Sequence, residues 1–106
     1  MTMRMRGGRY RETEVRALVE TYADSLEDRD TGTEKGLRAL IAIADIKLAY
    51  RQLALADQEM LLVCGVLNRT HREAAEWYEK SHTWVGKRYR DGILNLTDTM
   101  NGVPNG

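Results

Sequence analysis

Apolar residues recur along this chain at intervals of three and four, the spacing that places them on one face of an α-helix. The segment 10–27 carries such a stripe at Val15, Leu18, Val19, Tyr22 and Leu26. The segment 57–67 carries another, with core-like side chains at Met60, Leu61, Val63, Cys64 and Leu67. No stretch shows the strict alternation of a half-buried β-strand. The pattern therefore predicts an all-α protein of about five helices.

The segment 32–53 is apolar around much of its circumference. One stripe consists of Leu37, Leu40, Ile41, Ala44 and Leu48. A second stripe lies beside it and consists of Ala39, Ile43, Ile46 and Tyr50. Such a helix is buried on more than one side. In so short a chain, we expect the extra face to meet a second copy, which predicts a homodimer through the 32–53 helix.

Capping residues indicate where several helices begin. A Thr-x-x-Glu capping box at residues 31–34 opens the 32–53 helix, and Asp57 is expected to cap the helix at 57–67. Gly65 lies inside that helix, where glycine costs about 1 kcal/mol relative to alanine. It therefore predicts either a close approach of another helix or an early helix end.

Two further caps define a pair of short-linked helices at residues 70–78 and 81–96. Thr70 and Glu73 form a capping box, and Ser81 occupies the position of a second N-cap. Ala74 and Ala75 are small enough to let a second helix cross closely. Helix, short turn and helix is the arrangement that places a second helix in the DNA major groove.

The second helix of this pair has two distinct faces. Its predicted buried stripe is Val85, Tyr89, Gly92, Ile93 and Leu96. The opposite face supplies the candidate base-reading residues, which are His82, Thr83, Gly86, Lys87 and Arg90. The candidate phosphate contacts, which position the protein without reading sequence, are Arg69, His71, Arg72, Ser81 and Arg88. We expect Trp77 and Trp84 to belong to the core.

Residues 55–96 resemble the trihelical helix-turn-helix of sigma-factor region 4 and of small phage transcription regulators of the ArpU type. The positions in register with that pattern are Thr70, Glu73, Ala75, Glu76, Ser81, Val85 and Arg88. The turn differs, because Glu79 replaces the usual glycine and Lys80 the following aliphatic residue. Trp84 also replaces a threonine. We therefore expect either a left-handed non-glycine residue in the turn or a turn of different length.

The resemblance implies a transcription regulator that binds double-stranded DNA, with RNA polymerase as a further expected partner. The expected organisation is a disordered basic arm at 1–9, an N-terminal helical pair at 10–54, a helix-turn-helix at 55–97 and a flexible tail at 98–106. The helical pair would serve dimerisation or partner docking. A helical protein-interaction module and a phage terminase small subunit that recognises DNA remain alternatives.

The charge of the chain bears on how strongly it is expected to bind DNA. The 106 residues carry a formal net charge of zero, which weighs against a strongly electrostatic nucleic-acid binder. We therefore expect weak binding by a single copy, with affinity gained from dimerisation or a protein partner. Basic residues nevertheless concentrate between 69 and 90, and acidic residues between 20 and 34.

Candidate chemistry is sparse. The single cysteine, Cys64, fits a small buried hydrophobe in a reducing compartment, so a cytoplasmic location is expected. No apolar run reaches the roughly 18 residues of a membrane span. His71 and His82 are too few for a metal site. We expect no catalytic residues, no metal and no cofactor, and hence no enzyme.

Overall fold

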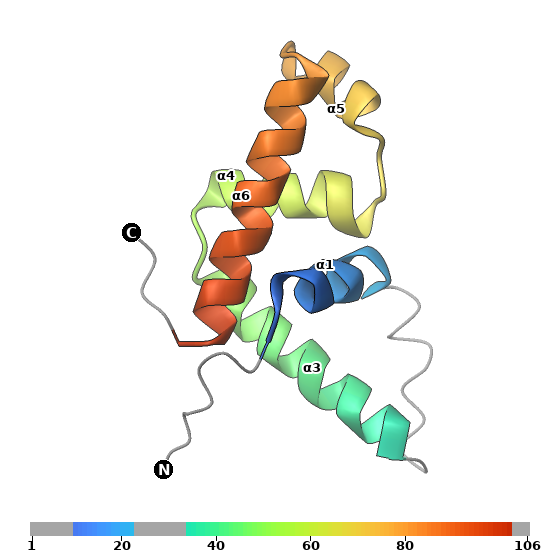
Figure 1. Ribbon diagram of the computed structural model, residues 1–106, viewed down its shortest axis with the longest axis vertical. Coiled ribbons are helices and arrows are strands. Elements are labelled where there is room, and N and C mark those ends of the chain that lie inside the picture. Colours follow the sequence, from blue (N-terminus) through green and yellow to red (C-terminus); the bar gives the residue numbers. More distant parts are fainter. Residues whose placement is uncertain (1–9, 23–33, 103–106) are drawn as a thin grey trace.

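The computed structural model describes residues 10–22 and 34–102, which form five helices and no strand (Figure 1). In chain order the elements are α1 (Glu12–Glu20), α3 (Glu34–Arg51), α4 (Leu55–Met60) with its direct π-helical continuation η1 (Leu61–Val66), α5 (His71–Tyr78) and α6 (His82–Met100). The predicted all-α class is confirmed. The basic arm at 1–9, the first three residues of the capping box at 31–34 and the last four residues of the tail lie outside the described residues.

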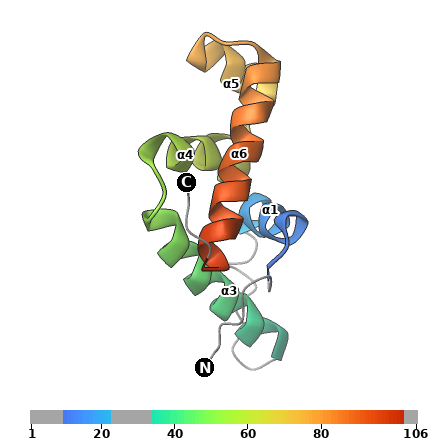
Figure 2. The same ribbon diagram turned by 60° about the vertical axis from the view of Figure 1, so that its left-hand side comes forward.

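Helix α6 is the longest of the described helices and lies at the centre of their packing. Each of the other described helices contacts it. In both views α5 lies beside the N-terminal end of α6, α4 crosses near its middle, and α1 and α3 lie toward its C-terminal end (Figures 1 and 2). The α5 end of the molecule is therefore remote from α3. Among the described helices, none combines the length and apolar character needed to cross a membrane.

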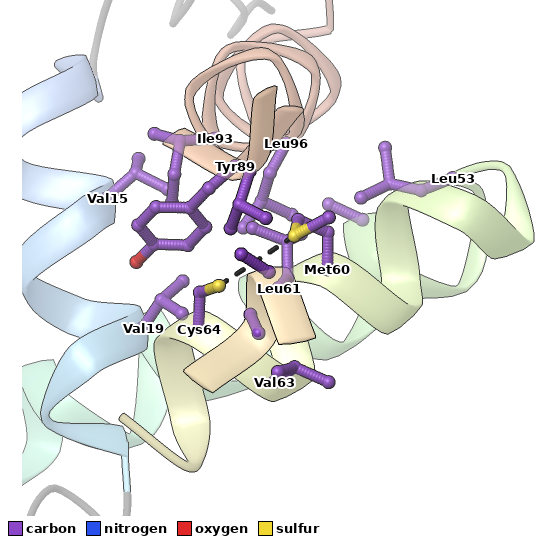
Figure 3. Packing of buried hydrophobic residues seen from close by; sticks show 14 residues of the cluster. Val15, Val19, Leu53, Met60, Leu61, Val63, Cys64, Tyr89, Ile93 and Leu96 are labelled. Carbon is purple, nitrogen blue, oxygen red and sulfur yellow. Dashed lines mark hydrogen bonds between the residues drawn. The ribbon is translucent and has the colours of Figure 1, made fainter. Parts of the chain in front are cut away.

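The predicted buried stripe of α6 is confirmed. Val85, Tyr89, Ile93 and Leu96 are each at most 2% exposed. The Tyr89 ring lies among side chains of α1 and η1, close to Val19 and Cys64 in the close view of the core (Figure 3). Helices α1, α4–η1 and α6 therefore share one apolar core.

Two contacts of Tyr89 join α1 to this core. The Tyr89 hydroxyl donates to Glu20 Oε2 over 2.8 Å, and the Arg16 guanidinium lies 5.1 Å from the Tyr89 ring centroid. Burial is the largest cause of the raised pKa of Tyr89, and the hydrogen bond to the Glu20 carboxylate raises this pKa further. The hydroxyl thus keeps its proton and remains a donor at neutral pH.

Cys64 is buried, as predicted, and its thiol lies 3.7 Å from the Met60 sulfur. Burial raises the pKa of the Cys64 thiol. Because the thiolate is the reactive form, this environment makes Cys64 a packing residue.

A π-helical turn interrupts the helix that begins at Leu55. The Leu67 amide donates to the Leu62 carbonyl over 2.9 Å, the five-residue spacing of a π-helix. Of the two alternatives predicted at Gly65, the structure shows the close approach of another helix, since a Cβ there would lie 2.3 Å from Val19 Cγ1. The prediction that Leu67 is a core residue is wrong: it is exposed. The wider turn shifts the register and turns Leu67 away from Val63 and Cys64.

The expected cap at Asp57 is also corrected. Helix α4 begins at Leu55, and its N-cap, Ala54, makes no side-chain capping bond. Asp57 is instead buried in the first turn. Its carboxylate accepts a 2.9 Å hydrogen bond from Asn95 Nδ2 and faces Arg88 Nη2 at 3.5 Å. The side chain thereby joins α4 to α6.

The two apolar stripes of α3 have different environments. Ile43 and Ile46, from the second stripe, are buried. Ile41 and Leu48, from the first stripe, are 54% and 60% exposed, and Ala44 between them is also exposed. The side chains of Leu37, Ala39 and Leu40 lie outside the described residues. Within the described residues, this face of α3 therefore remains uncovered.

The C-terminal helix is longer than predicted. It continues to Met100, so the expected flexible tail does not begin at residue 98. Thr97 is buried and its hydroxyl donates to the Ile93 carbonyl over 2.8 Å. Asn101, directly after the helix, exchanges two hydrogen bonds with the Tyr10 backbone, at 3.0 and 2.9 Å. Packing and these long-range bonds extend the order beyond the apolar stripe.

Candidate nucleic-acid interface

The candidate interface is the unit formed by α5, the turn at residues 79–81 and the N-terminal half of α6. The predicted capping box at its start is confirmed: Thr70 Oγ1 accepts from the Glu73 amide at 3.1 Å, and Glu73 Oε1 accepts from the Thr70 amide at 2.9 Å. The hydrogen bond from the Thr70 backbone lowers the pKa of the Glu73 carboxyl. The carboxylate therefore remains an acceptor through the neutral pH range.

Of the two alternatives predicted for the turn, the structure shows the left-handed non-glycine residue. Glu79 has φ 57° and ψ 45°. The Glu79 amide donates to the Glu76 carbonyl and the Lys80 amide donates to the Ala75 carbonyl, at 3.3 and 3.0 Å. These are the two bonds of a Schellman motif, which satisfies the carbonyls at a helix end. The turn therefore keeps ordinary helix-ending geometry at the cost of a strained residue.

Replacing Glu79 with glycine is expected to stabilise the protein by about 0.5–1 kcal/mol, because glycine adopts the left-handed region without the Cβ penalty. Urea denaturation followed by circular dichroism measures the change. The control is Glu76→Gly, inside the last turn of α5, which is expected to destabilise by about 1 kcal/mol. Destabilisation by Glu79→Gly would contradict the left-handed turn.

A second cap begins α6. The Ser81 hydroxyl oxygen accepts from the Trp84 amide at 3.0 Å, which confirms Ser81 as the N-cap. Ser81 is exposed, so the N-terminal end of α6 is open to solvent. Free N–H groups at such an end attract anions.

The two helices cross on small residues. Ala74 and Ala75 are buried, as is Val85 on the facing helix. The placement of Gly86 on the outward face is corrected, because a Cβ there would lie 3.3 Å from His71 Nδ1. Gly86 is half-buried and faces α5. Its lack of a side chain accommodates the His71 ring.

His71 has a structural contact as well as an exposed edge. Its ring lies edge-on to Tyr89, with 6.1 Å between ring centroids. The residue is nevertheless exposed overall. His71 therefore connects α5 to α6, and it remains accessible at the candidate interface.

Four of the candidate base-reading residues are exposed together on α6, namely His82, Thr83, Lys87 and Arg90. Lys87 Nζ lies 3.4 Å from Asp91 Oδ2, but such an exposed pair is worth about 0–1 kcal/mol and leaves the ammonium accessible. Arg90 forms no ion pair within residues 10–22 and 34–102. The same holds for the exposed Arg69 and Arg72.

Arg88, predicted to contact phosphate, has a partner within the protein. Its guanidinium lies 3.5 Å from the buried Asp57 carboxylate. Arg88 is partly buried, unlike Arg90 two positions later. Its position on the α4 side of the helix makes it part of the contact between α4 and α6.

The two tryptophans have different environments. Trp84 is half-buried against Tyr78, with ring centroids 5.9 Å apart, and Lys80 Nζ lies 5.5 Å from the Trp84 ring centroid. The core prediction is wrong for Trp77, which is 66% exposed. Tyr78 is half-buried beside Ala74, so it completes the inner face of α5. Trp77 lies on the outer face.

Asn95 and Glu20 make contacts that no sequence pattern predicts. Each reaches a partner far away along the chain, Asp57 and Tyr89 respectively. Their spacing follows no local motif. Only the packing of α1 and α4 on α6 brings these pairs together.

Comparisons of the chain with protein-family models, with curated proteins and with solved structures found no match.

Proposed function

We propose that the protein binds double-stranded DNA and regulates transcription, with α5 and α6 acting as a helix-turn-helix and α4–η1 as the third helix of the unit. The N-terminal half of α6 would enter the major groove. One observation carries the proposal: α6 buries Val85 and Tyr89 on one side and exposes Lys87 and Arg90 on the other. A lysine or arginine on such a helix face suits guanine O6 and N7.

Other exposed groups support the docking. Arg69 and Arg72 lie at the start of α5, where the first helix of such a unit crosses the DNA backbone. The open N-terminus of α6 at Ser81 adds a site for a phosphate. His82 and Thr83, in the first turn of α6, would reach base edges. Arg88 and Gly86 have no direct contact with DNA in this proposal, because they face α4 and α5.

The uncovered stripe of α3 supports a protein partner. Ile41, Ala44 and Leu48 are exposed on α3. Helix α3 lies at the opposite end of the molecule from α5 (Figures 1 and 2). A second copy joined there would leave both α5–α6 units free to bind DNA. Two copies would also compensate for the zero net charge, because each unit contributes its own phosphate contacts. RNA polymerase is the other proposed partner for this face.

The test begins with selection of bound sequences from a random duplex library at low salt. Fluorescence anisotropy then compares the selected duplex with an unrelated one. Lys87→Ala/Arg90→Ala is expected to weaken binding to the selected duplex by at least about tenfold, because each base contact is worth about 1–3 kcal/mol. Thermal unfolding checks that this variant remains folded.

The matched control is Lys47→Ala/Arg51→Ala, which removes the same charge from exposed positions of α3. It is expected to retain specific binding. Equal affinity of all three proteins would refute α6 as the recognition helix. Equal losses of affinity in both variants would show that the binding is non-specific and electrostatic.

The α3 stripe also favours the second candidate, a protein-interaction module without DNA binding. Sedimentation velocity distinguishes a dimer from a larger ring. A monomer–dimer equilibrium abolished by Leu48→Asp supports the α3 dimer, whereas a larger closed ring favours the terminase-like function. Absence of any selected duplex together with a stable assembly would favour the protein-interaction module.

A further inference from the structure

A cavity of about 340 Å³ is lined by residues of α1, α3, η1 and the C-terminal half of α6, and none of its described lining residues belongs to the candidate DNA interface. Its deep wall is formed by Ile46, Leu61 and Leu96, which are all buried. Tyr50 and Leu62 lie nearer the mouth, where Leu62 is 43% exposed. Its volume falls in the range of about 300–1,000 Å³ that is typical of small-molecule sites.

The lining determines the apolar part of an occupant. Protein interiors are packed as closely as organic crystals, so an unfilled apolar space of this size forfeits many contacts. The Tyr50 hydroxyl in the wall donates to the Gln58 carbonyl over 2.9 Å and is already satisfied. The wall therefore suits a hydrocarbon body.

The mouth determines the charged part. Lys47 and Arg51 are exposed lining residues four positions apart on α3, and the part of the lining that lies in residues 10–22 and 34–102 contains no Asp or Glu. Two cations at this spacing repel one another on a helix surface. Neither forms an ion pair within the described residues. A carboxylate between them would relieve the repulsion.

The π-helical turn contributes to the shape. Leu62 and Val66 both line the cavity, and the five-residue bond from the Leu67 amide to the Leu62 carbonyl widens the helix between them. Single π-turns inside α-helices frequently occur at functional sites. The departure from α-helical geometry thus coincides with the cavity.

We propose that this cavity binds a small carboxylic acid with a hydrocarbon chain. The chain occupies the space between Ile46 and Leu61, and the carboxylate lies between Lys47 and Arg51. The proposal does not depend on DNA binding, because it uses a different surface of the protein.

Isothermal titration calorimetry with sodium octanoate, below its micelle concentration, tests the proposal on the full chain. One octanoate is expected to bind per chain, at least about tenfold more tightly than 1-octanol, which has the same chain length without the charge. In ¹⁵N-labelled protein, the amide shifts are expected to centre on residues 46–51 and 61–66. Equal affinities for the acid and the alcohol would overturn the assigned ligand class, as would absence of saturable binding.

A variant pair isolates the role of the two cations. Lys47→Gln/Arg51→Gln is expected to bind octanoate no better than 1-octanol, whereas Arg11→Gln/Lys80→Gln, with the same loss of charge elsewhere, is expected to bind octanoate like the wild type. Unchanged octanoate affinity in the first variant would refute the site. Sedimentation without ligand adds a further check, since a dimer that buries the cavity and excludes octanoate would also refute it.

Discussion

Leu61→Ala is expected to lower the free energy of unfolding by about 2–5 kcal/mol, the range found when a large buried aliphatic side chain is truncated. Leu61 is 1% exposed and packs against Gly92 of α6. A Cβ atom added at Gly92 would lie 3.5 Å from Leu61 Cδ2. Leu61 also forms part of the wall of the existing cavity. The space left by truncation would therefore merge with an open volume that the surrounding helices cannot collapse to fill.

The neighbouring residue provides the control. Leu62 is 43% exposed, so Leu62→Ala is expected to cost less than about 1 kcal/mol. Urea denaturation of both variants, with the slope of the transition checked for constancy, measures the difference. Similar losses in the two variants would contradict the placement of Leu61 inside and Leu62 at the surface at the start of η1.

Gly65→Ala is expected to destabilise the protein by about 1–3 kcal/mol, although alanine is the better helix former. A Cβ at this position would lie 2.3 Å from Val19 Cγ1. Val19 is buried and β-branched, so its side chain has little freedom to move aside. The extra methyl group would therefore separate α1 from η1 and weaken the packing around Tyr89.

Gly92→Ala is the matched substitution on the facing helix. A Cβ there would meet Leu61 and the Asp57 carbonyl at 3.5–3.8 Å, which is ordinary van der Waals contact. Because alanine also favours the helix, Gly92→Ala is expected to stabilise by up to about 1 kcal/mol. Thermal unfolding of both variants compares them directly, and a stabilising Gly65→Ala would refute the close approach of α1.

Local sequence patterns predicted the parts of the fold that depend on neighbouring residues. The cap at Thr70 uses an atom three positions away, and the stripe from Val85 to Leu96 follows the period of a helix. The left-handed conformation of Glu79 also follows from a local requirement, namely the end of α5. Such features could be read from the chain because their geometry repeats wherever a helix begins, ends or buries one face.

The candidate site was only partly predictable from the sequence, because the environment of some of its residues depends on distant parts of the chain. Arg88 matched a basic position in the sequence pattern, but its environment depends on Asp57, which lies 31 residues away along the chain. Gly86 was predicted to approach DNA, whereas His71 of α5 occupies the space beside it. For these residues, the direction of the side chain follows from the crossing of two helices.

By itself the sequence determined that the chain is helical, where the two caps of the α5–α6 unit lie, and which face of α6 is buried. The tertiary structure decided that Trp77 lies outside, that Leu67 is exposed after a π-helical turn, and that Ile41, Ala44 and Leu48 of α3 are left uncovered by the described residues while Ile43 and Ile46 are buried. The physical reason is the range of the interactions. Caps and helical periodicity involve residues within one or two turns, whereas burial depends on which distant helix arrives to cover a face.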